Sequence, residues 1–297
     1  MYDLIIIGAG PAGMSAALYA LRANKKVLIL ESRSYGGQII DANKIENYPG
    51  IPKVSGIEYA SILFNQIIEL GVNIKYEKVI KIDEDKNVIT NENIYQGKGI
   101  IIATGLEHRK LRVEGEEEFI GKGVSYCATC DGNFYKNKVV AVIGGGNTAL
   151  CDTLYLSDIA SKVYLIHRRD TFRGEDKYLQ EIKTKSNVEI ILNSNVVNIN
   201  GKDTVDNILV LDKNKITKTL EVDGVFIAVG QVPKNDIFKD IIEIDDAGYI
   251  ISKDGVHTSL NSIYVAGDIR VKKLRQLVTA VSDGALAATT AIDEIRK

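Results

Sequence analysis

Two cysteines, Cys127 and Cys130, stand two residues apart in the stretch "SYCATCDGNFY" and are followed at once by Asp131. Thiols at this spacing can close a small disulfide loop at a turn or helix start, where free backbone N–H groups stabilise a thiolate. Asp131 can then carry a proton during thiol–disulfide interchange, although such a residue equally often caps a turn or a helix. The stretch therefore predicts a redox-active dithiol.

A metal site and a pair of buried core thiols are the alternatives for this cysteine pair. Tetrahedral zinc needs a closed set of protein ligands, and only Cys151 and the dispersed His108, His167 and His257 remain outside the pair. We therefore expect no metal. Cysteine is often buried as a small hydrophobe, and we expect this of Cys151, on the inner face of a helix.

The N-terminal stretch "YDLIIIGAGPAGMSAALYALRANKKVLILE" has the order of a βαβ nucleotide-binding unit. An apolar strand, an amphipathic helix and a second apolar strand end at Glu31, and the loop before the helix carries Gly8, Gly10 and Gly13. Such a loop brings a pyrophosphate to the helix N-terminus, and Glu31 can accept hydrogen bonds from ribose hydroxyls. A carboxylate here favours a non-phosphorylated ribose, as in FAD or NAD.

The same pattern returns in "KVVAVIGGGNTALCDTLYLSDIASKVYLIHRRDTFR", whose loop carries Gly144, Gly146 and Ala149. His167 stands where the first unit has its ribose carboxylate, and three arginines follow it: Arg168, Arg169 and Arg173. Guanidinium groups bind a 2′-phosphate through charge-assisted hydrogen bonds, which favours NADP. A solvated basic loop is the alternative reading of this stretch.

The rest of the pattern predicts the elements that position these sites. Each βαβ unit is followed by an alternating segment, residues 72–90 or 188–224, which is typical of antiparallel ribbons. A short apolar strand comes next, at residues 98–105 or 222–230. The C-terminal "SIYVAGDI" and "RQLVTAVSDGALAATTAIDEI" add a strand, a Gly-Asp turn and an Ala-rich helix without a third unit. We expect this C-terminal part to pack on the first domain.

We therefore predict an α/β protein with two Rossmann-like three-layer (ββα) nucleotide-binding domains, the second inserted in the first. Linkers are expected at "LEHRKLRVEG" and "QVPKND". The expected bounds are a first part of the FAD-binding domain at residues 1–108, an NAD(P)H-like domain with the cysteine pair at 109–235, and a second part of the FAD-binding domain at 236–297.

Composition and charge exclude several classes of function. The chain of 297 residues has a formal net charge of −2 and an isoelectric point near 6.0, which argues against a nucleic-acid partner. No apolar run reaches the ~20 residues that cross a bilayer. The start, "MYDLIIIGAG", has neither the basic region nor the cleavage site of a signal peptide. We expect a cytoplasmic protein without a membrane partner.

Eight motifs follow one another along nearly the whole chain: "GAGPAG", "GGQIIDANKIENYPG", "ATG", "CATCDG", "GGGNTA", "HRRDTFR", "AGDI" and "RQLVTAVSDGALAA". In this set and order the sequence resembles the low-molecular-weight thioredoxin reductases. The resemblance implies a cytoplasmic homodimer in which electrons pass from NADPH through FAD to the Cys127–Cys130 disulfide. From there they would reach the disulfide of thioredoxin or a thioredoxin-like protein.

The resemblance also assigns roles by position. Cys130 would be the thiol nearest the flavin, Cys127 the thiol that attacks the protein substrate, and Asp131 the proton donor. The FAD-binding positions would be Gly8, Gly10, Pro11, Ala12, Gly13, Glu31, Gly36, Gly37, Gln38, Asn47, Ala103, Thr104, Gly105, Gly267, Asp268, Arg275, Gln276 and Leu277. The NADPH-binding positions would be Gly144, Gly146, Asn147, Thr148, Ala149, His167, Arg168, Arg169 and Arg173.

The chain departs from the family at two places. After "GGGNTA" the family usually has a Glu-Glu pair, where this chain has Leu150, Cys151 and Asp152. After "HRRxxxR" it usually has Ala, where this chain has Gly174 and then Glu175. A carboxylate beside the phosphate site would weaken NADPH binding, by ~1 kcal/mol or more at an effective dielectric constant of about 20. Reduced ferredoxin is therefore an alternative electron donor.

Two further classes of function share the expected fold. A flavin-dependent ferredoxin–NADP reductase would not need the cysteine pair, so its activity would survive the substitution Cys130→Ser. A flavin-binding regulatory or scaffold protein that senses redox state would hold a flavin that no donor reduces.

Overall fold

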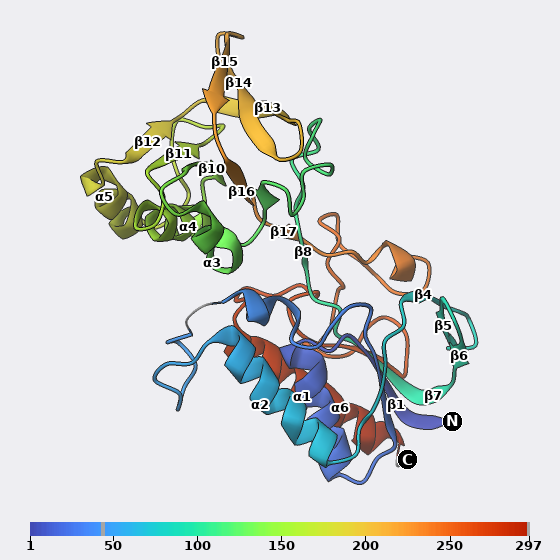
Figure 1. The fold of residues 1–297 in the computed structure, drawn as a ribbon. Coiled ribbons are helices and arrows are strands. Elements are labelled where there is room, and N and C mark those ends of the chain that lie inside the picture. The colour runs from blue at the N-terminus through green and yellow to red at the C-terminus, as the bar shows by residue number, and fades with distance from the viewer. Residues whose placement is uncertain (43–44, 296–297) are drawn as a thin grey trace. The chain divides into compact units, whose positions relative to one another are not determined.

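The computed structural model describes residues 1–42 and 45–295, so Asn43 and Lys44 of the "GGQIIDANKIENYPG" motif lie outside the described residues. The chain divides into two compact units (Figure 1). Unit 1 comprises Met1–Glu107 and Val232–Lys297, and unit 2 comprises His108–Gln231. Each unit has its own parallel sheet and its own hydrophobic core.

Unit 1 is built on a parallel five-stranded sheet with the strand order β18-β7-β1-β2-β3. The central strand β1 is a continuous apolar run, as expected where both faces of a parallel sheet are covered. The glycine loop follows this strand directly and leads into the first helix. The strands are β1 (Tyr2–Ile7), β2 (Val27–Leu30), β3 (Asn73–Lys75), β7 (Gly97–Ile102) and β18 (Ile263–Val265).

Helices cover one face of this sheet and an antiparallel meander covers the other. Leu4 and Ile6 of β1 pack with the helices, whereas Ile5 and Ile7 pack with the meander. The C-terminal helix lies along the first helix. The helices are α1 (Pro11–Arg22), α2 (Gly56–Glu69) and α6 (Leu277–Ile295), with short 3-10 turns η1 (Gly37–Asp41) and η3 (Asp236–Phe238). The meander consists of β4 (Val79–Ile82), β5 (Val88–Thr90) and β6 (Ile94–Tyr95).

Unit 2 repeats this layered arrangement. Its parallel sheet has the order β12-β11-β10-β16-β9. One face packs on helices α4 (Asn147–Ser157) and α5 (Asp176–Thr184), and the other packs on an antiparallel ribbon. The sheet strands are β9 (Val124–Ser125), β10 (Val139–Gly144), β11 (Lys162–Ile166), β12 (Val188–Ile191) and β16 (Gly224–Ala228). The ribbon consists of β13 (Ser194–Gly201), β14 (Val205–Asp212) and β15 (Thr217–Glu221).

Short elements complete the chain. The two connecting strands, β8 (Glu107–His108) and β17 (Gln231–Val232), pair with each other. Both strands lie within the linker segments expected from the sequence, "LEHRKLRVEG" and "QVPKND". Between β9 and β10, the chain forms the one-turn helix α3 (Ala128–Asp131) and the 3-10 turn η2 (Gly132–Tyr135).

The predicted fold class, two Rossmann-like units with the second inserted in the first, is confirmed. The C-terminal strand and helix pack on unit 1 as expected. Two segments were predicted wrongly. Residues 73–75 and 188–191 were each expected to open an antiparallel ribbon, but they form β3 and β12, which pair in parallel with β2 and β11. Since β3 follows helix α2, the chain makes a crossover and returns to the edge of the same sheet.

Candidate active site

Cys127 and Cys130 form a disulfide with 5.3 Å between their Cα atoms. Cys127 caps helix α3, and the backbone N–H of Cys130 donates to Cys127 Sγ over 3.1 Å. Cys127 is half-buried and Cys130 is exposed. The predicted disulfide loop at a helix start is thus confirmed. The N–H donor lowers the cost of a negative charge on Cys127, because it already points at the sulfur.

Asp131 is the last residue of α3 and is half-buried. Its backbone N–H donates to the carbonyl of Cys127 over 3.2 Å, which closes the turn around the disulfide. Burial, followed by the negative charge of Asp131, raises the pKa of Tyr135. The carboxylate of Asp131 therefore acts electrostatically within this small region, while its part in proton transfer stays a prediction.

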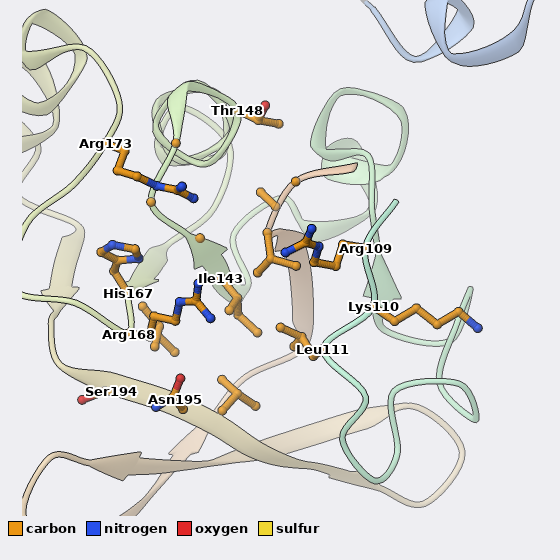
Figure 2. Close-up of a pocket in the computed structure, with 18 residues that line it drawn as sticks. Arg109, Lys110, Leu111, Ile143, Thr148, His167, Arg168, Arg173, Ser194 and Asn195 are labelled. Atoms are coloured by element: carbon orange, nitrogen blue, oxygen red, sulfur yellow. The ribbon is translucent and has the colours of Figure 1, made fainter. Parts of the chain in front are cut away.

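Unit 2 contains a pocket of about 280 Å³ where the second glycine loop, the end of β11 and the start of β13 meet (Figure 2). Every charged side chain that lines it is cationic. Figure 2 shows Arg109, Arg168 and Arg173 pointing toward a shared space, whereas Lys110 extends away from it. The Lys110 ammonium pairs with Glu117 over 2.6 Å. Three guanidinium groups from two separate chain segments thus give the pocket an anion-binding character.

The arginine loop is tied back onto the glycine loop. The backbone N–H groups of Arg173 and Gly174 both donate to the carbonyl of Gly145, over 2.7 Å and 3.1 Å. The ring of His167 lies directly against Gly145, where an added Cβ would come within 2.1 Å of it. Only glycine therefore fits at this position. A side chain at position 145 would displace the His167 ring, and with it the arginine loop that follows His167.

His167 supports the pocket rather than offering a charge to it. Its ring stacks on Phe172 with 5.1 Å between centroids, and Nε2 lies 3.1 Å from the carbonyl oxygen of Thr171. Burial, together with the positive charges of the arginines that follow, lowers the pKa of His167. At neutral pH the ring is therefore uncharged, and the residue predicted for the ribose position lines the pocket with its side chain already engaged.

The two departures from the family pattern are linked by packing. Gly174 leaves room for Leu150, because an added Cβ at position 174 would lie 2.5 Å from Leu150 Cδ1. Glu175 does not line the pocket among the described residues. Its carboxylate accepts from Asn147 over 3.0 Å and pairs with Lys177 over 2.8 Å. The expected repulsion of a 2′-phosphate by Glu175 is thus reduced by these partners.

The expectation that Cys151 is buried was wrong, because Cys151 is exposed. The buried positions of α4 are Ala149, Leu150, Thr153, Leu156 and Ser157, so residue 151 falls outside the buried face of this helix. Asp152, which follows it, is half-buried. Burial raises the pKa of Asp152 to about 7.

The positions expected to bind FAD all belong to unit 1, and loops far apart in the sequence meet there. The carboxylate of Glu31 accepts from the backbone N–H groups of Ala9 and Arg33, over 2.8 Å and 2.9 Å. Asn47 donates to Gln276 over 2.9 Å. These hydrogen bonds fix the positions of the glycine loop, the end of β2, the segment around Asn47 and the start of α6.

Within the part of the chain that the structure describes, Asp268 has an unpartnered buried acceptor atom in unit 1. Its Oδ1 atom is buried and has no hydrogen-bond partner among the described residues, and the Lys272 ammonium lies 3.8 Å from it. Burial raises the pKa of Asp268. Arg275 donates from Nε to the Asp268 carbonyl over 3.2 Å, so this loop is fixed while the acceptor stays available.

The remaining FAD-binding positions surround these groups. Gly37 lies against Gly10, since an added Cβ at position 37 would be 3.2 Å from Gly10 Cα. Gln38 donates to the Leu106 carbonyl over 2.6 Å. The predicted residues that follow strand ends or begin a helix in unit 1 are Gly8, Pro11, Ala12, Gly13, Gly36, Ala103, Thr104, Gly105, Gly267 and Leu277.

Sequence reasoning missed several residues of the unit 2 pocket. Arg109 and Lys110 come from the segment after β8, and Ser194 and Asn195 come from the start of β13. No motif marks them, because they reach the pocket through the fold rather than through the glycine loop. Conversely, three residues that were predicted to bind the nucleotide are not among the described residues that line the pocket: Asn147, Ala149 and Arg169.

Comparison with known proteins places these sites in context. Residues 2–284 match the pyridine nucleotide-disulphide oxidoreductase family. The chain is 43% identical over 299 residues to the thioredoxin reductase of Treponema pallidum, which covers 99% of this chain and 97% of that protein. It is 41% identical to the thioredoxin reductase of Listeria monocytogenes, with 100% and 96% covered. The crystal structure of Lactococcus lactis thioredoxin reductase matches with a TM-score of 0.91 and 38% identity, covering 100% and 99%.

Proposed function

The chain belongs to the pyridine nucleotide-disulphide oxidoreductase family, and we propose that it is a thioredoxin reductase with NADPH as electron donor. It is a flavin-dependent enzyme that reduces disulfides. The observation that carries the proposal is the Cys127–Cys130 disulfide in the same unit as a pocket whose charged lining is wholly cationic. A dithiol and an anion site together suit the passage of electrons from a phosphorylated nucleotide to a protein disulfide.

FAD is the flavin that fits unit 1. The buried, unpartnered Oδ1 of Asp268 suits a hydroxyl of the ribityl chain, and the glycine loop of α1 suits a pyrophosphate. Glu31 would accept hydrogen bonds from the adenosine ribose. Arg275, Gln276 and Leu277, at the start of α6, would lie beside the flavin ring. When bound, FAD supplies a carrier between a hydride donor and a disulfide.

NADPH would bind in the unit 2 pocket. Gly144, Gly146 and Thr148 line this pocket and would admit the pyrophosphate to the N-terminus of α4, whose first turn also holds Asn147 and the buried Ala149. Arg168 and Arg173 would hold the 2′-phosphate. The paired state of Glu175 supports NADPH over the alternative donor, ferredoxin.

The dithiol chemistry is proposed with the roles that the resemblance to the thioredoxin reductases assigns to Cys127 and Cys130. In the reduced enzyme, the thiolate of Cys127 attacks one sulfur of the thioredoxin disulfide and displaces the other as a thiolate, giving a mixed disulfide. The thiolate of Cys130 then attacks Cys127 Sγ, which restores the enzyme disulfide and releases the second thioredoxin sulfur. Asp131 would supply a proton to a leaving thiolate. The substrate gains two electrons, and the enzyme dithiol loses two.

The proposed setting is a homodimer in the cytoplasm, with thioredoxin or a thioredoxin-like protein as partner. Relatives that are similar over nearly the full chain are named thioredoxin reductases, which supports the choice of partner. No helix among the described residues has the length and apolar character to cross a bilayer.

An anaerobic titration tests the donor. NADPH, NADH and reduced ferredoxin are added separately to the purified yellow protein, and flavin absorbance is followed. We expect NADPH to bleach the flavin at a much lower concentration than NADH, and ferredoxin to be without effect. Bleaching by ferredoxin but not by NADPH would replace the proposed donor with the alternative one.

A second experiment tests the acceptor. Cys130→Ser is expected to abolish NADPH-driven reduction of thioredoxin while FAD stays bound, because the second interchange step loses its nucleophile. NADPH-driven reduction of ferredoxin that survives this substitution in full would favour a flavin-dependent ferredoxin–NADP reductase instead. A bound flavin that none of the donors reduces would favour a regulatory or scaffold protein.

A further inference from the structure

Glu116 is a buried carboxylate in unit 2 that lies outside all the motifs of the sequence. It is 1% exposed, although it belongs to the run Glu116–Glu118 whose other two members are exposed. A buried carboxylate is costly unless donors surround it. Three donors reach Glu116: the backbone N–H groups of Leu111 and Arg112, over 2.9 Å and 2.6 Å, and the hydroxyl of Tyr126, over 2.7 Å.

The two backbone donors belong to one wall of the nucleotide pocket. Arg109, Lys110 and Leu111 line the pocket, and Arg112, directly after them, adopts the left-handed backbone with φ of 63°. A non-glycine residue rarely takes this conformation without support. The carboxylate of Glu116 supplies that support, since it accepts from two consecutive N–H groups, those of Leu111 and of Arg112 itself. The path of the chain through residues 109–111, the Arg109 wall of the pocket, therefore depends on Glu116.

The third donor belongs to the segment that carries the dithiol. Tyr126 immediately precedes Cys127, and burial, then the hydrogen bond to Glu116, raise the pKa of Tyr126, so that its hydroxyl stays a donor. The tyrosine ring also stacks on His108, with 5.5 Å between ring centroids. Next along the chain, the backbone N–H of Cys127 donates to Ser125 Oγ over 3.0 Å. One buried carboxylate thus contacts both the pocket wall and the residue beside the attacking cysteine.

We propose that Glu116 is a positioning residue that fixes the Arg109 wall of the nucleotide pocket and the Tyr126–Cys127 segment in one arrangement. The proposal rests on the proposed function, because it gives both segments a part in the same electron path. Glu116 touches neither nucleotide nor sulfur. It acts through the backbone of Leu111 and Arg112 on one side and through the Tyr126 hydroxyl on the other.

The test separates the two arms of Glu116 with three variants of the FAD-loaded enzyme. Tyr126→Phe removes only the arm toward the dithiol. Glu116→Gln weakens both arms, because it removes the negative charge that strengthens all three hydrogen bonds, and its amide NH₂ must in addition face at least one of the donors. Glu118→Gln is the matched control, since it makes the same chemical change at an exposed position two residues away. Flavin absorbance and melting temperature establish that each variant is folded.

The first readout is nucleotide binding, measured by calorimetric titration with 2′-phospho-ADP-ribose, which transfers no electrons. We expect Glu116→Gln to weaken binding by about tenfold, the effect of losing one charge-assisted hydrogen bond. Tyr126→Phe and Glu118→Gln should stay within about twofold of the wild type. Unchanged binding in Glu116→Gln would overturn the pocket arm of the proposal.

The second readout uses no nucleotide. Dithiothreitol reduces the Cys127–Cys130 disulfide, and the electrons then appear as anaerobic bleaching of the flavin. Tyr126→Phe and Glu116→Gln should each slow this bleaching by about fivefold or more, and should lower kcat with thioredoxin to a similar extent. Rates equal to those of Glu118→Gln would overturn the dithiol arm. If Glu116→Gln does not fold, Tyr126→Phe alone decides: a lower kcat with unchanged nucleotide binding supports the proposal, and no change in kcat overturns it.

The outcomes for Glu116 and for the proposed function are distinguishable. Wild-type protein that NADPH does not bleach would refute the proposed donor, yet the dithiothreitol readout would still report on Tyr126 and Glu116. Conversely, full NADPH-driven turnover in every variant would leave the proposed function intact and refute the positioning role.

Discussion

The arginines of the unit 2 pocket differ in what the fold allows them to reach. Arg168 and Arg173 line the pocket, while Arg169, between them in the sequence, does not. The loop is held by the two N–H groups that donate to the Gly145 carbonyl. At the scale of single residues, an anion in this pocket therefore meets two arginines of the motif and Arg109 from outside it.

Removal of one pocket arginine should change nucleotide selectivity. Arg173→Ala is expected to raise the KM for NADPH about tenfold or more, the effect of a lost charge-assisted hydrogen bond to phosphate, with little change in the KM for NADH. Arg169→Ala is the matched control and should leave the ratio of the two KM values nearly unchanged. Steady-state kinetics with both nucleotides measure this, and equal losses for NADPH and NADH would contradict a phosphate role for Arg173.

The packing of Gly174 against Leu150 predicts a coupling between these two positions. Gly174→Ala should destabilise the protein by about 1–3 kcal/mol through overpacking, because the new Cβ meets Leu150 Cδ1. Leu150→Val should cost about 1 kcal/mol through a small cavity. The double variant should be more stable than the sum of the single effects predicts. Urea denaturation of the four proteins measures this, and strict additivity would show that the two positions do not interact.

At the scale of elements, the end of α6 is tied to the loop before β18 by a chain of polar side chains. His257 Nδ1 lies 2.5 Å from Asp254 Oδ2, and Nε2 lies 2.8 Å from Glu294 Oε1. Tyr264 donates to the other oxygen of Glu294 over 2.5 Å. The hydrogen bonds to Asp254 and then Glu294 raise the pKa of His257. The clamp is therefore strongest when the imidazole is protonated.

This clamp should make stability depend on pH. Because the folded-state pKa of His257 is raised, its contribution is complete below the unfolded-state value of about 6.5 and disappears as the pH rises through the folded-state value. His257→Gln should therefore lower the free energy of unfolding at pH 6 by about 0.5–1 kcal/mol, discounted for solvent screening. The difference from wild type should shrink toward pH 9. A difference that grows with pH would show that His257 is neutral in the folded protein.

At the scale of the whole molecule, each unit has a separate sheet and core. We expect scanning calorimetry to resolve two unfolding transitions. Removal of FAD should lower the melting temperature of unit 1. At a hundredfold excess over its Kd, 2′,5′-ADP should stabilise unit 2 by about 2.7 kcal/mol and so raise its melting temperature. Displacement of both transitions by either ligand would show that the units unfold as one cooperative body.

Local motifs allowed much of this molecule to be predicted from sequence. The disulfide and the repeated βαβ units depend on residues close together in the chain, so their patterns are readable without a structure. The cofactor roles assigned by position stay predictions. Arg109 and Glu116 escaped prediction because the fold brings them to the pocket wall from a segment without a motif. Cys151 was misjudged because an apolar helix flanked by packing partners does not reveal which side chains face outward.

Because Cys151 is exposed, the number of sulfurs per chain that a thiol reagent modifies shows whether the Cys127–Cys130 pair is oxidised or reduced. With Cys127 and Cys130 joined, a thiol reagent should modify one sulfur per chain, and after reduction it should modify three. Partial desolvation raises the pKa of the Cys151 thiol, so this modification should be faster above pH 8 than at pH 7. A dye coupled there under oxidising conditions would label unit 2 at a single site and leave the reactive pair untouched.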